Sequence, residues 1–285
     1  MPCPYRPSDR RTSDFGPGPA RFSPCYTPSV PPLTVTLVTR NESANIAAAL
    51  ESVAWADEII VVDAESGDDT VAIARRFTER VIVREWPGYV AQKNFAAEQS
   101  CHDWILSLDA DERVTPALAG EIRDVLQAPP TPAGFRVPRV SFYLGRWLRS
   151  TDWYPDFQLR LYDRRRARWE GRYVHESVRA DGPVGRLREE LLHYPYRDIA
   201  HHVQTIDRYT TLAAQQAAER GKRASVADVL VRPPLAFARN YLLRLGIKDG
   251  GAGLVVSLLN SYYVFLKFAK LWELRRTPRA KGLEP

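Results

Sequence analysis

Two aspartates separated by one residue, Asp109 and Asp111, follow an apolar run and are the residues best suited to chemistry. In an extended backbone such residues face the same side, so their carboxylates lie close together and repel each other unless a cation or a proton intervenes. Hard oxygen ligands suit Mg²⁺ or Mn²⁺, which commonly bridge one or two carboxylates to phosphate oxygens. The pair therefore predicts a divalent-cation site for a substrate that carries a diphosphate.

Two common nucleotide-binding motifs are missing from the sequence. It contains no GxxxxGK[ST] loop, which argues against a P-loop kinase or ATPase. It has no GxGxxG after the first predicted strand either, which argues against a dinucleotide-dependent oxidoreductase. The predicted site therefore belongs to a different class of nucleotide-binding protein.

The aspartate pair ends one of four predicted strands that alternate with helices. Apolar, β-branched runs predict the strands, and Ala-rich or acid-opened stretches predict the helices, with Ser43 as the cap of the first helix. This alternation predicts right-handed βαβ units and an α/β fold, with a mostly parallel sheet covered by helices on both faces. The predicted strands span residues 33–39, 58–62, 80–84 and 104–108, and the helices 43–53, 69–79 and 89–100.

Polar residues follow three of these strands directly. They are the stretches 39–42, 63–68 and 109–111. Asp, Ser and Gly often end strands as ordinary turn residues. Three such loops at the carboxyl edge of one parallel sheet, however, favour a ligand-binding crevice.

The sequence contains the segments TVTLVTRNE, EIIVVDAESGDDT and DWILSLDADE within residues 33–126. Together they resemble the nucleotide-binding half of family 2 glycosyltransferases of the GT-A fold. The further segments REWPGYVAQKNFA, DWYPDFQLRLYDR and RYVHESV are similar to bacterial lipopolysaccharide-core glucosyltransferases. The resemblance implies a GT-A domain over residues 33–200, with a nucleotide-binding half at 33–126 and an acceptor half at 127–200.

The resemblance also implies roles for the polar residues. Asp111 would be the ligand of Mn²⁺ or Mg²⁺, and the donor would be a nucleotide-diphosphate sugar, with UDP-glucose expected. The reaction would invert the anomeric carbon, with a carboxylate as general base for the attacking hydroxyl. The residues implied in nucleotide-sugar binding are Thr39, Asn41, Glu42, Asp63, Gln92, Lys93 and Asp109.

Two carboxylates compete for the role of catalytic base. Glu176, which follows His175 and a predicted aromatic and basic strand (FQLRLYDRRRARW), occupies a position similar to acidic residues on the acceptor side of the family. Asp156, two residues after Tyr154, is the rival. The sequence lacks the Glu-Asp pair that often follows Gly-Gly-Phe in the family, so both candidates stay open. Each also has a structural explanation, because Glu176 can pair with Arg172 or Arg179 and Asp156 can cap a turn after Pro155.

The acceptor side is expected to include His175, Trp153 and Arg160, since aromatic faces stack well on sugars. The expected acceptor is a hydroxyl of a lipid-linked glycan such as lipopolysaccharide core. An alternative in the same fold is a polyprenyl-phosphate glycosyltransferase. In that case Arg160, Arg164 and Arg165 would hold the acceptor phosphate.

The net charge of +6 is unevenly distributed along the chain. Residues 186–285 hold 17 Lys and Arg against 9 Asp and Glu, whereas residues 1–185 hold 23 against 25. Apolar and aromatic residues recur at helical spacing beside the C-terminal cations, so residues 201–285 are predicted to form a helical region that associates with an anionic membrane surface. No nucleic-acid-binding motif accompanies this charge, and nucleic acid is not an expected partner. The residues concerned are Leu254, Leu258, Tyr262, Phe265, Trp272, Lys267, Lys270, Arg275 and Arg276.

Residues 1–32 hold nine of the 22 prolines and lack the apolar core of a secretory signal, so they are predicted to be a disordered tail. The longest uncharged run beyond the tail, residues 250–266, has 17 residues, which is at or below the length of a spanning helix. The expected location is cytoplasmic, peripheral on the cytoplasmic face of the inner membrane.

Overall fold

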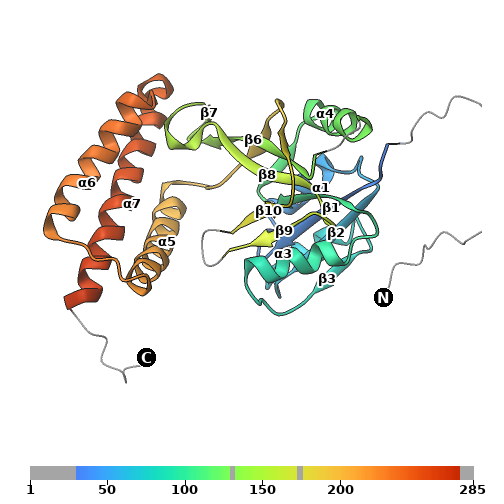
Figure 1. The fold of residues 1–285 in the computed structure, drawn as a ribbon, viewed down its shortest axis with the longest axis horizontal. Helices are drawn as coiled ribbons and strands as arrows, with labels where there is room; N and C mark the ends of the chain where they lie inside the picture. Colours follow the sequence, from blue (N-terminus) through green and yellow to red (C-terminus); the bar gives the residue numbers. More distant parts are fainter. Residues whose placement is uncertain (1–29, 129–131, 172–175, 277–285) are drawn as a thin grey trace, which may run out of the picture.

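A computed structural model describes residues 30–128, 132–171 and 176–276 of the chain. Its centre is a ten-stranded mixed sheet of order β3-β2-β1-β4-β8-β6-β12-β5, with β7 and β11 also paired to β6, and a separate hairpin joins β9 to β10 (Figure 1). Most of the predicted tail, residues 1–29, lies outside the described residues. The strands are β1 Leu33–Thr39, β2 Glu58–Asp63, β3 Val81–Val83, β4 Trp104–Asp109, β5 Glu112–Val114, β6 Gly134–Tyr143, β7 Arg146–Leu148, β8 Asp156–Asp163, β9 Ala167–Glu170, β10 Ser177–Ala180, β11 Val184–Arg186 and β12 Leu191–His193.

The parallel strands β3, β2, β1 and β4 are the four strands that the sequence predicts. β1 lies between β2 and β4, with Thr39 opposite Asp63 and Val38 opposite Asp109. The three polar loops therefore leave the sheet side by side at one edge, as expected for a parallel arrangement.

Helices cover both faces of this sheet. One face packs against α1, α2 and α4 through Leu33, Val35 and Leu37 of β1, and the other packs against α3 through Val38. The alternation follows from the two-residue period of a strand. The helices are α1 Ile46–Ser52, α2 Thr70–Ala74, α3 Tyr89–Glu98 and α4 Pro116–Gln127.

Two predicted helices differ from the observed ones at their ends. The N-cap residue of the first helix is Asn45 and not Ser43. The backbone N–H of Ser43 instead donates to Asp68 in the neighbouring loop. The second helix ends at Ala74 instead of continuing to residue 79. It ends early because the Thr78 hydroxyl donates to the Ile59 carbonyl of β2 at 2.8 Å.

In the second half of the sheet, only β8 has a counterpart in the sequence-based prediction, because it overlaps the aromatic and basic strand FQLRLYDRRRARW, whose end forms β9. β8 pairs antiparallel with β4, and β6 pairs antiparallel with β8. The short strand β5 pairs with β12, which places His193 opposite Glu112. Residues from distant parts of the sequence therefore meet beside the aspartate pair. A pairing of such short strands leaves too weak a local pattern to predict.

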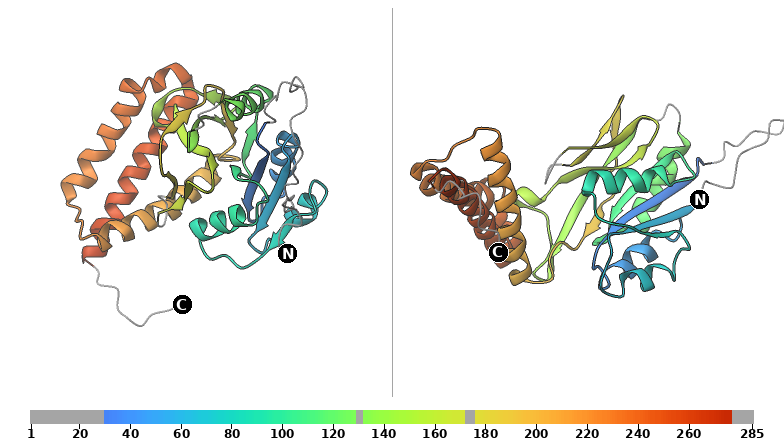
Figure 2. Two further views of the ribbon diagram at one scale, coloured as in Figure 1. Left: turned by 45° about the vertical axis from the view of Figure 1, so that its right-hand side comes forward. Right: turned by 90° about the horizontal axis from the view of Figure 1, so that it is seen from below.

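The C-terminal region is helical, as predicted, and begins at Ile199. Helices α5, α6 and α7 pack together beside the sheet, as Figures 1 and 2 show from three directions. α6 begins with a capping box of Ser225 and Asp228, and a π-helical turn and a 3₁₀ turn connect it to α7. The elements are α5 Ile199–Glu219, α6 Val226–Ala238, η2 Arg239–Leu243, η3 Gly246–Asp249 and α7 Gly250–Arg276.

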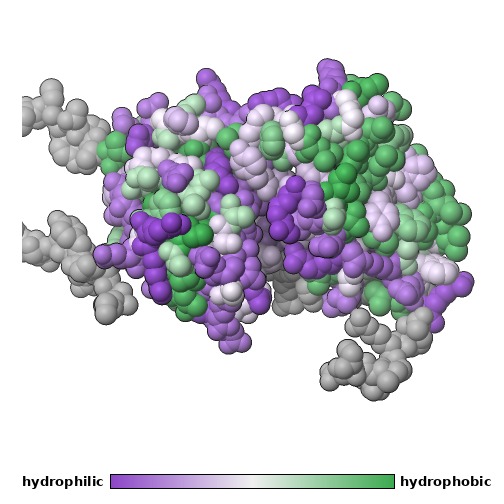
Figure 3. All heavy atoms as spheres, turned by 180° about the vertical axis from the view of Figure 1, so that it is seen from behind, coloured by the Kyte–Doolittle hydropathy of each residue, from purple (hydrophilic) through white to green (hydrophobic). Residues whose placement is uncertain are grey.

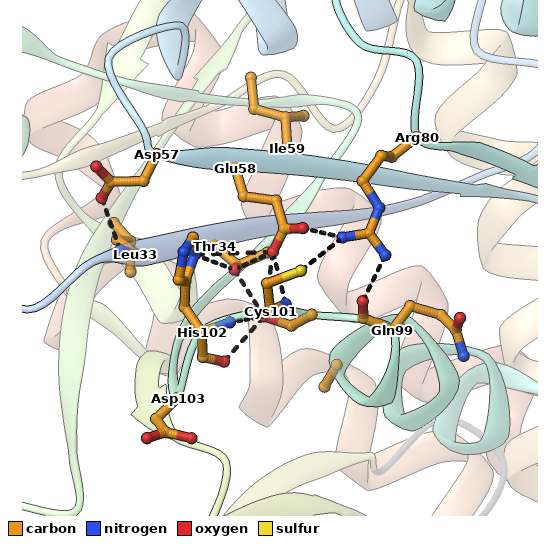
Figure 4. A network of polar contacts seen from close by, with 12 residues as sticks. Leu33, Thr34, Asp57, Glu58, Ile59, Arg80, Gln99, Cys101, His102 and Asp103 are labelled. Atoms are coloured by element: carbon orange, nitrogen blue, oxygen red, sulfur yellow. Dashed lines mark hydrogen bonds and ion pairs between the residues drawn. The ribbon is translucent and has the colours of Figure 1, made fainter. Parts of the chain in front are cut away.

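A polar network joins the amino ends of the central strands, at the edge opposite the three loops (Figure 4). The carboxylate of Glu58 accepts hydrogen bonds from the Thr34 hydroxyl at 2.6 Å and from the Cys101 backbone N–H at 2.9 Å. It also pairs with Arg80, and the Nδ1 atom of His102 lies 3.0 Å from the Thr34 hydroxyl. The network ties together strands that lie far apart in sequence.

Candidate active site

A cleft of about 1200 Å³ lies at the carboxyl edge of the parallel strands. The loop after β1 and the Asp109–Asp111 turn form one wall, and helices α5 and α7 form the opposite wall through residues such as Thr205 and Tyr263. The helical region is therefore part of the cleft and not a separate appendage.

The loop after β1 places three predicted nucleotide-binding residues in the cleft wall. Thr39 is buried, and its hydroxyl has no hydrogen-bond partner among the described residues. Asn41 adopts a left-handed backbone conformation with φ of 55°, which Asn tolerates better than most residues. Its side-chain carbonyl accepts the Gly67 N–H at 2.8 Å, so it fastens the first loop to the second. Burial raises the pKa of Glu42, although a hydrogen bond from Asn45 opposes the shift.

Two of the predicted nucleotide-binding residues do not line the cleft. Asp63 is fully buried, and its carboxylate accepts both the N–H and the hydroxyl of Ser66, at 2.8 Å and 2.5 Å. Gln92 is fully buried as well, and neither atom of its amide group has a partner among the described residues. The structure gives Asp63 the role of holding the second loop, and a nucleotide contact by either residue stays a prediction.

Carboxylates and cations alternate along the floor of the cleft. Asp109 pairs with Lys93 at 2.9 Å and with Arg160, and Arg160 also reaches Glu112 at 2.5 Å. The series continues through Arg139, which lies 2.9 Å from Glu112 and 2.6 Å from Asp156. Three carboxylates thus alternate with three cations, and we call this series the charge ladder.

The charge ladder explains why Asp109 and Asp111 can lie together. Burial alone would raise the pKa of Asp109, but the adjacent Arg160 and Lys93 hold that pKa far below its usual range. Asp109 is therefore charged, and its charge is already compensated by the protein. The repulsion expected from the sequence is relieved at Asp109 by two side chains, which leaves Asp111 as the carboxylate free for a metal.

Asp111 lies beside a histidine that the sequence analysis did not identify. Its Oδ2 atom is 3.4 Å from the Nε2 atom of His193, and the other ring nitrogen of His193 is 3.0 Å from the Ser141 hydroxyl. The pairing of β5 with β12 holds this arrangement, because the Tyr194 N–H also donates to the Asp111 carbonyl at 2.9 Å. Ser141 thus orients the imidazole toward the carboxylate.

This pair fits a divalent cation of the kind predicted. Carboxylate oxygen and imidazole nitrogen are both ligands that Mn²⁺ accepts, and such ions usually complete their coordination with water and substrate phosphate oxygens. Within residues 30–128, 132–171 and 176–276, no group of three or more His, Cys, Asp or Glu side chains could hold a metal alone. The substrate would therefore have to supply part of the coordination.

The two candidate bases differ in their surroundings. Glu176 lines the cleft, and its buried Oε2 atom has no hydrogen-bond partner among the described residues. Arg179, a predicted partner of Glu176, pairs with Glu170 instead. Asp156 does not line the cleft, because Arg139 and the Gln158 amide engage its carboxylate. His175 lies outside the described residues.

Aromatic side chains line part of the cleft. Trp153 packs against Tyr196 and His202 with ring centroids 5.8 Å and 5.5 Å apart, and Tyr196 stacks on His202 at 3.9 Å. Closer to the loops, Lys93 lies over the ring of Trp169 at 4.2 Å. Trp153 thus lines the cleft, and its contact with an acceptor stays a prediction.

The three arginines expected to hold an acceptor phosphate do not lie together. Arg160 is nearly buried within the charge ladder, on the same wall as Asp109. Arg164 donates to backbone carbonyls of Ala97 and Ser100, and Arg165 pairs with Asp103 before β4. Strand β8 runs antiparallel to β4, so residues 164 and 165 emerge at the opposite edge from the cleft. The prediction that these three arginines jointly hold an acceptor phosphate is therefore wrong.

The fold and the cleft define an α/β glycosyltransferase of the GT-A type that uses a nucleotide sugar. The chain belongs to glycosyl transferase family 2, whose sequence profile matches residues 34–181. It is 30% identical over 249 residues to the lipopolysaccharide core biosynthesis glycosyltransferase LpsC of Rhizobium meliloti, a match that covers 85% of this chain and 92% of LpsC. A glycosyltransferase of Rickettsia felis is 31% identical over 253 residues, 85% of this chain and 89% of that protein.

The same fold is found in a mannosyltransferase from Pyrobaculum calidifontis, solved in complex with GDP-mannose and Mn²⁺. Its TM-score is 0.52 at 17% sequence identity, and the match covers 87% of this chain and 89% of that one. At this identity the similarity establishes the fold.

Proposed function

We propose that the protein is an inverting, metal-dependent hexosyltransferase that moves glucose from UDP-glucose to a hydroxyl of a lipid-linked glycan, such as lipopolysaccharide core. The observation that carries this proposal is the carboxylate of Glu176, whose buried Oε2 atom has no hydrogen-bond partner among the described residues, in the same cleft as the Asp111–His193 pair. One group is suited to remove a proton, and the other to hold a cation at a diphosphate. The similarity to LpsC over most of both chains supports the acceptor class.

The donor side would act on the leaving group. Asp111 and His193 would hold Mn²⁺ or Mg²⁺, which acts as a Lewis acid on the departing diphosphate. Lys93 is 6% exposed and borders the cleft, so its ammonium group adds a fixed positive charge at the same wall. Thr39 and Asn41 would border the nucleotide, with the free hydroxyl of Thr39 available for a hydrogen bond.

The acceptor side would activate the incoming hydroxyl. Glu176 would accept the hydroxyl proton as the new bond to the anomeric carbon forms and the bond to the diphosphate breaks. Asp156 is less suited to this step because Arg139 and Gln158 already use its carboxylate. The aromatic surface of Trp153 and Tyr196 would orient the acceptor sugar.

A donor and acceptor screen tests the proposal. The purified full-length chain is incubated with Mn²⁺, one nucleotide sugar at a time and extracted bacterial membrane glycolipid, and released nucleotide diphosphate is measured. Release with UDP-glucose that requires the glycolipid is the expected result. Release that requires polyprenyl phosphate would replace the hydroxyl acceptor by a phosphate acceptor, and release with another nucleotide sugar would overturn the donor.

A further inference from the structure

Apolar side chains gather on the outer surface of helices α6 and α7 (Figure 3). Twelve of the seventeen exposed large hydrophobic side chains of the described residues lie between positions 226 and 265. The exposed fraction is 67% for Leu230, 63% for Leu235 and 79% for Leu243. We call this surface the hairpin face, and it comprises Val226, Leu230, Val231, Leu235, Leu242, Leu243, Leu245, Ile247, Leu254, Leu258, Tyr262 and Phe265.

The hairpin face is exposed although both of its helices are packed into the fold. α6 buries only Pro233, although the Ser261 hydroxyl of α7 donates to the Pro233 carbonyl at 2.8 Å. α7 buries its other side, where Ala252 and Val256 pack below Tyr143 and Leu148 of the sheet. Apolar clusters of this extent on a soluble protein mark a surface that binds a partner.

The charges around the hairpin face are those that suit a lipid surface. In the described part of the chain, no carboxylate forms an ion pair with Arg220, Lys222 or Arg223 at one end of the helices, or with Lys248 at the other. Burial, together with the positive charges of Lys222 and Arg232, lowers the pKa of Lys267. Unpaired cations beside an apolar face complement anionic headgroups. A second copy of the chain would bring the same cations face to face.

The helical segment Gly246–Leu274, which comprises η3 and most of α7, is long and apolar enough to cross a membrane. Its polar contacts argue against a spanning orientation. Lys270 donates to the Asp207 carboxylate at 2.7 Å, and Asn260 donates to Asp152 at 3.3 Å. A spanning helix would strip these groups of their partners, which is costly in hydrocarbon. The expectation that Lys270 is one of the cations facing the membrane is wrong, because Lys270 contacts Asp207 of α5.

We propose that the protein binds the surface of an anionic bilayer through the hairpin face, with α6 and α7 lying in the plane of the interface. The opposite side of α7 lines the cleft through Leu259 and Tyr263, so the bilayer and the cleft are separated by one helix. An acceptor whose lipid stays in the bilayer could thereby reach Glu176. The binding itself does not rest on the proposed reaction.

Vesicle flotation tests this proposal without donor, acceptor or turnover. The full chain should float with vesicles of equal parts phosphatidylcholine and phosphatidylglycerol, and weakly with phosphatidylcholine alone. Each Leu→Glu change on the face removes the burial of one leucine, so Leu243→Glu should lower vesicle partitioning on the order of tenfold and the Leu235→Glu/Leu243→Glu variant further. Val83→Glu, a change at an exposed apolar residue of β3, is the matched control and should bind like the wild type.

Folding and competing outcomes are resolved by two further measurements. Thermal unfolding and nucleotide binding should be unchanged in the leucine variants, which separates lost lipid binding from lost structure. Carbonate at high pH should release the wild type from bacterial membranes. The proposal would be overturned if the wild type floated with neither vesicle, or if the double variant floated as well as the wild type. Retention of the wild type in membranes after carbonate, or a wild-type dimer that the double variant abolishes, would overturn it as well.

Discussion

The two edges of the parallel strands hold similar side chains in different states. At the amino edge, Glu58, Arg80 and His102 lie beside a cavity of about 640 Å³, and the Glu58 carboxylate is held by Thr34, Cys101 and Arg80. At the carboxyl edge, buried polar atoms of Thr39 and Glu176 have no partner among the described residues.

A cavity alone therefore does not mark a functional site. Both edges have a cavity, a carboxylate, an arginine and a histidine, but among the described residues only the cavity at the carboxyl edge is lined by residues with buried, unpaired polar atoms. An unsatisfied buried polar group is costly, so a protein keeps it where a substrate completes it. Substitutions should therefore affect turnover at the carboxyl edge and stability at the amino edge.

The largest effect is expected for Asp111→Ala. Loss of the carboxylate should reduce transfer on the order of 10³-fold, because the metal that we propose to neutralise the leaving group would no longer be held. Measured as nucleotide diphosphate release over a range of Mn²⁺ concentrations, the loss should not be recovered by excess metal. The melting temperature should change little, since this side chain is 27% exposed. Near wild-type turnover would remove Asp111 from the metal site.

Glu176→Gln should reduce kcat by about 10²- to 10³-fold and leave the KM for the nucleotide sugar unchanged, because a general base acts on the acceptor. Steady-state kinetics with the donor varied at saturating acceptor make the measurement. Asp156→Asn is the control and should cost less turnover, with a loss of stability from the broken pair with Arg139. The opposite order of the two variants would assign the base to Asp156.

At the amino edge, Glu58→Ala should lower the free energy of unfolding by about 2–3 kcal/mol, because it removes the carboxylate that Arg80, the Thr34 hydroxyl and the Cys101 N–H share. Its kcat should stay within about twofold of the wild type. Chemical denaturation and the transfer assay provide the two readings. Glu58→Gln, which keeps an acceptor for Thr34, should lose less stability. A large loss of kcat in folded Glu58→Ala would contradict the expectation that substitutions at the amino edge affect stability and not turnover.

The smallest effect concerns the pH dependence of stability in the cleft. Burial, with His201 as a second cause, lowers the pKa of His202 to about 4. The unfolded state therefore binds this proton more readily, so the contribution is present above about pH 6.5 and is lost as the pH falls toward 4. The loss should be about 1–2 kcal/mol after allowance for partial solvent exposure. Melting temperatures of the wild type and His202→Phe between pH 7 and pH 4 check it, and parallel curves would contradict it.

The sequence predicts the parallel half of the sheet because its strands are continuous β-branched runs. Buried parallel strands need apolar side chains on both faces, and that requirement is local. The three loops follow, since each begins where a run ends. The early end of α2 could not be predicted, because it depends on the contact of Thr78 with Ile59 of β2, which lies 19 residues earlier in the chain.

The part of the site that escaped prediction depends on long-range pairing. His193 and Glu112 meet only because β12 lies against β5, and each strand is too short to leave a pattern of its own. Arg139 and Arg160 reach Glu112 from strands β6 and β8, which join the sheet without a helical crossover between them. The lining of the cleft by α7 is likewise a tertiary contact that its apolar sequence does not reveal.

The charge ladder has a further consequence for how the cleft responds when charge moves in it. Its six groups, from Lys93 to Asp156, alternate in sign and are held by direct ion pairs. Fixed dipoles of this kind do not need to rotate when a leaving group becomes negative, unlike water at the same place. Folding already fixes these charged groups in place. Water dipoles at the same position would have to reorient during the proposed reaction.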